Sequence, residues 1–235
     1  MSFFGARIRA RAVPTVLALC CAFAVEAGGL AVSDSRIILS NGQTVSGFVL
    51  ANTSQSQFLT KVWVETKQGE EAEDIMAVPP VAYSPPGKHV RFQVMLLHPE
   101  KYAKDKETLF YLRTHSVPGD GKSQRALTLA YDVKLKVFYR PEGLEGDMAS
   151  AIEDLRWSLK KGELKAYNPS NYHVSIVTYG LNTDYTEIQD CVIPPGESLS
   201  FSVSKQYPEK VKVRWAAIDD YGSPIRRSTV IKNER

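Results

Sequence analysis

Apolar side chains recur at every second position along most of the chain between residues 35 and 232, in short runs separated by Gly, Pro, Asn and Ser. This period of two is typical of β-strands that bury one face. Many short strands at close spacing predict an all-β fold built from sandwiches. The expected strands are residues 36–39, 45–51, 60–65, 90–97, 108–113, 127–139, 163–167, 173–180, 191–193, 198–203, 210–219 and 229–231.

Only one segment, residues 148–160, shows a helical tendency, and it follows a turn signal at residues 141–144 (PEGL). We interpret it as the connection between two sandwiches, because a sandwich domain typically has about 100 residues. The predicted organisation is an N-terminal domain at residues 28–141, a linker at 142–149 and a second domain at 150–235.

The longest expected strand, residues 127–139, has one continuous apolar face. Threonine, alanine, aspartate and lysine occupy the positions in between. A strand of this kind can simply line a core. It can also be an edge whose apolar side chains serve a partner. Proteins usually protect such edges against pairing, so an unprotected edge would indicate a binding function. The side chains of the apolar face are Leu127, Leu129, Tyr131, Val133 and Leu135.

The first 27 residues have the features of a secretory signal peptide. Three arginines precede an apolar stretch at residues 13–24, and small residues follow it. The stretch is shorter than the roughly 20 residues that a membrane-spanning helix needs. We expect an exported protein, not embedded in the membrane, with cleavage after Ala27 or, alternatively, after Ala24.

The charge balance argues against a nucleic-acid partner. The chain has 29 basic and 26 acidic residues, and removal of the signal takes away three arginines and one glutamate. The remaining net charge is close to zero, whereas nucleic-acid binding usually requires a strong basic excess.

Few residues point to catalysis, a metal or a cofactor. Cys20 and Cys21 lie in the signal, so Cys191 has no partner for an intramolecular disulfide and is interpreted as a strand cysteine. The four histidines lack the spacing of metal ligands, and no catalytic or phosphate-binding motif occurs. We therefore expect neither an enzyme nor a bound metal or cofactor.

A series of short motifs runs through nearly the whole chain. The most specific is VKLKVFYRP at residues 133–141. The order and spacing of these motifs resemble the periplasmic pilus chaperones of the chaperone/usher type. The others are RIIL (36–39), LAN (50–52), VWVE (62–65), VPPV (78–81), DKETLFYL (105–112), VP (117–118), YNPS (167–170), IPPG (193–196) and IDDYG (218–222).

The resemblance implies two immunoglobulin-like β-sandwich domains arranged in an L, with a cleft between them. In this family a pilus subunit lacks its last strand, and the chaperone fills the gap with its own strand. The implied function is to bind, fold and cap pilus or fimbrial subunits in the periplasm and to deliver them to an outer-membrane usher. Whether the free chaperone caps its own strand by forming a homodimer stays open at the level of the sequence.

The resemblance also implies roles for five charged residues. Arg36 and Lys136 match the positions that hold the terminal carboxylate of the subunit. Glu107, Arg140 and Asp220 match a charge network between the domains.

Two further questions stay open at the level of the sequence. Lys136 occupies an even position and the expected donor residues odd positions, so either they use opposite faces of the strand or a bulge intervenes. An exported adhesin or pilus subunit with immunoglobulin-like folds is the alternative function, although the two-domain length and the cation pair disfavour it.

Overall fold

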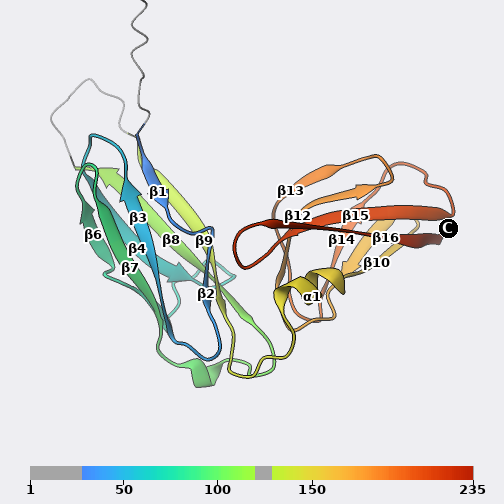
Figure 1. Cartoon of the computed structure of the whole chain (residues 1–235), viewed down its shortest axis with the longest axis horizontal. Helices are drawn as coiled ribbons and strands as arrows, with labels where there is room; N and C mark the ends of the chain where they lie inside the picture. The colour runs from blue at the N-terminus through green and yellow to red at the C-terminus, as the bar shows by residue number, and fades with distance from the viewer. Residues whose placement is uncertain (1–27, 120–128, 235) are drawn as a thin grey trace, which may run out of the picture.

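The computed structural model describes residues 28–119 and 129–234. The expected signal peptide and Leu127 lie outside the described residues. Figure 1 shows two β-domains that meet at an angle, with the junction beside β2 and α1. The all-β prediction is confirmed, because helix is confined in the described part to η1 (Pro99–Lys101) and α1 (Met148–Glu153). Both segments are far too short to cross a bilayer.

The first domain is a sandwich of a four-stranded and a five-stranded sheet. Their strand orders are β1-β3-β7-β5 and β2-β9-β8-β4-β6. Alternate residues of both sheets meet in one core, which includes Leu39, Phe92, Leu112 and Val137, all nearly inaccessible to solvent. The strands are β1 (Leu30–Val32), β2 (Arg36–Leu39), β3 (Val45–Asn52), β4 (Phe58–Glu65), β5 (Ile75–Val78), β6 (Val81–Ser84), β7 (His89–Leu96), β8 (Thr108–Pro118) and β9 (Tyr131–Tyr139).

The second domain has its own core, around Trp157 and Trp215. Its strand order is β13-β12-β15-β16-β10-β11-β14, and β16 joins the two halves of the sandwich. β16 pairs antiparallel with β15 along its length and parallel with β10 at its end. The strands are β10 (Arg156–Lys160), β11 (Glu163–Tyr167), β12 (Val174–Leu181), β13 (Thr186–Ile193), β14 (Ser198–Ser202), β15 (Lys210–Ile218) and β16 (Pro224–Glu234).

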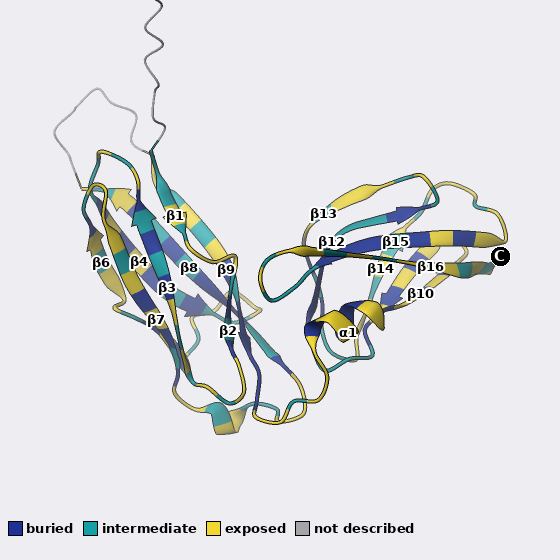
Figure 2. Cartoon of the chain, in the orientation of Figure 1, coloured by how far each residue is buried: buried dark blue, intermediate teal, exposed yellow. Residues whose placement is uncertain are grey.

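Figure 2 shows how burial alternates along the strands of both domains, as the period-two pattern predicts. The helical tendency of residues 148–160 is correct only for α1. Asp147 caps this helix by accepting a hydrogen bond from the Ser150 backbone N–H at 2.8 Å. The helix ends at Glu153, and Arg156–Lys160 forms β10, because Trp157 and Leu159 alternate with exposed residues.

Four short strands were absent from the expected set: β1, β5, β6 and β10. Three of them have only three or four residues, too few for a clear alternation. The longest expected strand is shorter than predicted, since β9 begins at Tyr131 and not at residue 127. Cys191 is buried on β13, as expected.

Candidate functional site

Strand β9 has a partly open edge. On one side it pairs with β8 along its whole length. On the other side β2 pairs only with residues 136–139. No described strand covers that side of residues 131–135, so their outward backbone N–H and C=O groups form an edge that another strand can extend.

The apolar face of β9 changes environment along the strand. Leu135 is only 7% exposed and belongs to the core of the first domain. Val133 is half-buried against the same core, and Tyr131 makes an edge-to-face contact with Phe58 at 5.5 Å. Leu129 lies just before the strand and is 56% exposed.

The sequence left open whether this apolar face lines a core or serves a partner, and the structure places Leu135 in the core. Leu135 packs into the core between the two sheets of its own domain, although the pairing of β2 begins only at Lys136. The side chains that remain accessible are those from Leu129 to Val133.

Arg36 and Lys136 are brought together by the parallel pairing of β2 with β9. They are direct register partners, so both side chains project from the same face of the sheet. The pairing of β9 with β8 shows no register shift. Lys136 and the apolar residues Val133 and Leu135 therefore lie on opposite faces, and no bulge is needed.

The Arg36 side chain reaches toward the second domain. Its Nη1 donates a hydrogen bond to the Ile218 carbonyl oxygen at 3.2 Å, and its guanidinium lies 6.0 Å from the centre of the Phe138 ring. Its Nε is buried without a hydrogen-bond acceptor among the described residues. Burial lowers the pKa of Arg36, against the opposing attraction of Asp220 and Asp219. An incoming carboxylate would supply the missing acceptor.

Arg140 lies between two carboxylates at the junction of the domains. Its Nε donates to Glu107 Oε1 at 2.7 Å, and its Nη1 and Nη2 donate to the two oxygens of Asp220 at 2.6 Å each. The structure thus brings together Glu107, Arg140 and Asp220 across the domain boundary. Burial disfavours the charge of Arg140, but the hydrogen bonds and attraction of the two acids outweigh burial and raise its pKa.

Local backbone geometry positions each member of this network. Arg140 follows β9 directly, and its N–H continues the pairing with β2 by donating to the Leu39 oxygen at 2.8 Å. Asp220 lies in the turn between β15 and β16. Asp219 Oδ1 accepts hydrogen bonds from the Tyr221 and Ser223 N–H groups in that turn. Gly222 there has a φ of +83°, which favours glycine.

His173 is a fourth member of the network that the sequence reasoning missed. The Glu107 carboxylate oxygen Oε2 accepts a hydrogen bond from the His173 N–H at 2.7 Å and lies 3.1 Å from His173 Nδ1. The Glu107 side chain is fully buried. His173 follows the YNPS motif by three positions, but nothing in its spacing distinguishes it from a surface histidine.

A two-domain β-sandwich with an open strand edge beside two cations defines a class of protein that binds an extended segment of another protein. The family model for the N-terminal domain of PapD, a pili and flagellar-assembly chaperone, matches residues 29–145. The model for the C-terminal domain of the pili assembly chaperone PapD matches residues 150–229. The chain belongs to the family of pilus assembly chaperones.

Individual proteins agree with this assignment. The probable fimbrial chaperone LpfB of Escherichia coli O157:H7 is 24% identical over 226 residues, covering 94% of this chain and 97% of LpfB. The crystal structure of the YadV chaperone has a TM-score of 0.74 and 25% identity, covering 86% of this chain and 98% of YadV. SafB of Salmonella enterica, solved in complex with the SafA pilin, has a TM-score of 0.76 at 17% identity, covering 86% and 96% of the two chains.

Proposed function

We propose that this pilus chaperone works in the periplasm, where it binds, folds and caps pilus subunits by donating strand β9 and passes them to an outer-membrane usher. The open edge of β9 beside Arg36 and Lys136 is the observation that carries the proposal. SafB, which shares the fold, has been solved with a bound pilin. The expected signal peptide supports export. Strand donation needs no catalysis, since pairing and burial provide the binding energy.

Two kinds of interaction would hold a subunit on β9. Backbone hydrogen bonds along residues 131–135 tolerate many subunit sequences, because they involve no side chains. Apolar side chains at the open end would enter the incomplete core of the subunit. Each such burial contributes roughly 1.5–3 kcal/mol before ordering costs. The side chains proposed for this role are Leu127, Leu129, Tyr131 and Val133.

The cation pair would fix the register of the bound strand. A slip of one residue turns every side chain of a strand to the other face, so a donated strand needs an anchor. Arg36 and Lys136 share one face of neighbouring strands and can both donate to a single terminal carboxylate. Their position on the face opposite to Val133 lets the anchor and the donated side chains act without competing for space.

The alternative function, an exported adhesin or pilus subunit, is less well supported. Both family models that match the chain describe chaperone domains, and together they span the two sandwiches.

Delivery to an usher requires a surface that a bound subunit leaves uncovered. Leu59, Tyr83 and Val117 form an exposed apolar row across β4, β6 and β8, with exposed fractions of 47%, 50% and 38%. Strands β4 and β6 lie at the edge of the sheet opposite to β2 and β9. We assign the usher contact to this row, because it is apolar and exposed and extends from β8 to β6, the edge strand opposite to β2.

The anchor can be tested with a subunit whose C-terminal carboxylate is replaced by an amide. Replacing either Arg36 or Lys136 with Ala should leave the chaperone folded and lower subunit capture about tenfold to a hundredfold, as expected for a lost charge-assisted hydrogen bond. The amidated subunit should bind the wild type poorly and the Lys136→Ala variant scarcely worse. The reason is that amidation and the substitution remove the same interaction, so their effects should not add.

The wild type and the Lys136→Ala variant, each with the natural and the amidated subunit, give four combinations. Thermal melting of the chaperone and capture of the subunit should be measured for all four. Lys134→Ala is a matched control, since Lys134 projects from the same face of β9 and packs over the Tyr111 ring. Amidation of the subunit should lower its capture by the Lys134→Ala variant as much as it lowers capture by the wild type. Undiminished capture by Arg36→Ala, or full additivity of Lys136→Ala with amidation, would show that the register is set elsewhere.

A further inference from the structure

The outer face of the sheet formed by β12, β15 and β16 is strongly basic. Trp215 and Val213 point into the core of the second domain, so the alternating positions of β15 face outward, and their register partners on β16 do the same. Glu187 and Glu209 are acidic residues beside this face, and Glu209 pairs with Lys232 at 3.6 Å. The cations on the face are Lys210, Lys212, Arg214, Arg226 and Lys232.

A hollow of about 600 Å³ lies in this face. Its lining includes Thr178, Ala216 and Ser228, whose small side chains leave room above the sheet. Ala216 pairs with Arg226, and Arg214 pairs with Ser228, so the two arginines are diagonal neighbours on the same side of the β15–β16 pair. Diagonal neighbours lie about 7–8 Å apart, with somewhat less between their Cβ atoms, a spacing at which two guanidinium groups can reach one carboxylate.

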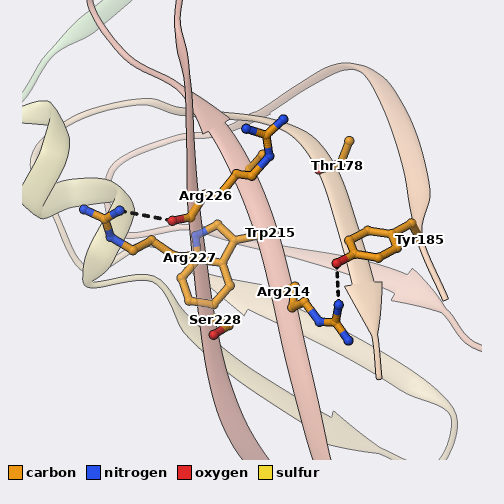
Figure 3. A pocket seen from close by; sticks show the side chains of 8 residues that line it. Thr178, Tyr185, Arg214, Trp215, Arg226, Arg227 and Ser228 are labelled. Atoms are coloured by element: carbon orange, nitrogen blue, oxygen red, sulfur yellow. Dashed lines mark hydrogen bonds between the residues drawn. The ribbon is translucent and has the colours of Figure 1, made fainter. Parts of the chain in front are cut away.

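Arg214 is held in place without being neutralised. Its Nη1 donates to the Tyr185 hydroxyl at 2.5 Å, its Nη2 donates to the Asn182 carbonyl oxygen, and it stacks on the Tyr185 ring at 5.1 Å. Figure 3 shows this contact with Tyr185 at one side of the pocket. Two of the five guanidinium N–H donors are thus used, and the buried Nε has no acceptor among the described residues.

Arg226 also lacks a carboxylate partner within the part of the chain that the structure describes. Arg227 also lines the hollow, but it pairs with Glu153 of α1 at 3.6 Å. Figure 3 shows its side chain extending toward the helix. Of the three arginines that line the hollow, Arg214 and Arg226 therefore remain without a carboxylate partner among the described residues. They lie beside the hydroxyls of Thr178, Tyr185 and Ser228. This combination is suited to a carboxylate.

We infer that this face is a second protein-binding surface, which takes an extended acidic segment of a partner and receives one of its carboxylates between Arg214 and Arg226. Lys210, Lys212 and Arg214 are two residues apart on one strand, so their charges repeat about every 7 Å. Acidic side chains at alternate positions of an extended segment have the same repeat. Val230 and Tyr185 are the exposed large hydrophobic residues at this face. The Tyr185 hydroxyl is hydrogen-bonded to Arg214, so the face offers little apolar surface to insert into a membrane.

The surface is separate from the donor edge, because all its residues lie in the second domain. Its test uses a peptide of alternating glutamate and threonine, with a peptide of glutamine and threonine as the uncharged control. Binding to the purified chain is followed by NMR titration. We expect Arg226→Gln to weaken binding of the acidic peptide at least tenfold and Arg226→Lys to weaken it less, because Lys keeps the charge but loses the planar fork.

Arg156→Gln is the matched control, since Arg156 is an exposed arginine on β10 and should not affect the peptide. Arg36→Ala should also leave peptide binding intact while lowering subunit capture, which separates this inference from the proposed strand donation. Equal binding of the two peptides, or equal loss with Arg156→Gln, would overturn the inference. Displacement of the peptide by an equal concentration of inorganic phosphate would also overturn it. The same holds if the chain binds phosphatidylglycerol vesicles through Arg226 but does not bind the peptide.

Discussion

At the scale of single residues, Arg140 shows why an arginine is needed between the domains. Glu107 is fully buried, and a buried carboxylate is costly unless charged or hydrogen-bonding groups surround it. The fork of Arg140 serves Glu107 through Nε and Asp220 through both terminal nitrogens, a geometry that lysine cannot reproduce. His173 supplies the remaining donors to Glu107.

Replacing Arg140 with Ala should lower the free energy of unfolding by about 3–5 kcal/mol, because it leaves the Glu107 charge buried with one partner fewer. Urea unfolding measures this loss, with the exposed Arg156→Ala as the control. Adding Glu107→Gln to Arg140→Ala should recover part of the stability, since it removes the uncompensated charge. If the double variant is no more stable than the single variant, the buried charge is not the cause.

At the scale of the element, β9 serves two purposes with one alternating pattern. Its C-terminal half is a core strand, held by β8 and β2, and contributes Leu135 and Val137 to the sandwich. Its N-terminal half has a neighbour on one side only. The same period of two that buries alternate side chains in the C-terminal half continues to Leu129, just before the strand. Leu129 is exposed there, because no described strand covers that end.

Leu129→Ser should leave the stability of the free chaperone within about 0.5 kcal/mol, as is usual for an exposed position. Subunit capture should fall about tenfold or more, because burial of one leucine is lost from the complex. Leu59→Ser is a control of matched size and similar exposure on β4. It should keep subunit capture and reduce transfer to the usher. Equal capture by the Leu129 variant and the wild type would argue against donation from this end of β9.

At the scale of the whole molecule, the angle between the domains depends on contacts from several elements. The Glu107 N–H donates to the Asn171 oxygen at 2.9 Å, and Arg36 donates to the Ile218 oxygen. The Phe138 and His173 rings lie 6.1 Å apart across the junction. The two-oxygen contact of Asp220 with Arg140 adds the tip of the β15–β16 hairpin to these contacts.

Asp220→Ala should loosen the domain angle while leaving both sandwiches folded, because Asp220 lies in a turn and not in either core. Small-angle scattering should show a broader range of overall dimensions, and calorimetry should separate the unfolding of the two domains. Asp219→Ala would disturb the same turn without touching Arg140 and serves as the comparison. An unchanged scattering profile for Asp220→Ala would mean that the other contacts alone fix the angle.

The sequence by itself determined the strand periodicity, the all-β class and the charged residues at the junction. Alternation of apolar residues follows directly from the pleat of a strand, and short motifs record turns and charges that lie close together in the chain. Glu107, Arg140 and Asp220 could be named in advance because the motifs that contain them match a known family.

Only the tertiary structure decided which neighbours cover each face. A period of two says that one face is apolar, but whether Leu135 meets its own core or a partner depends on how far the facing sheet covers β9. His173 joined the network because the domain junction places it beside Glu107, although 66 residues separate them in the chain. The basic face likewise depends on the register of the β15–β16 hairpin, because that register decides which cations share one face.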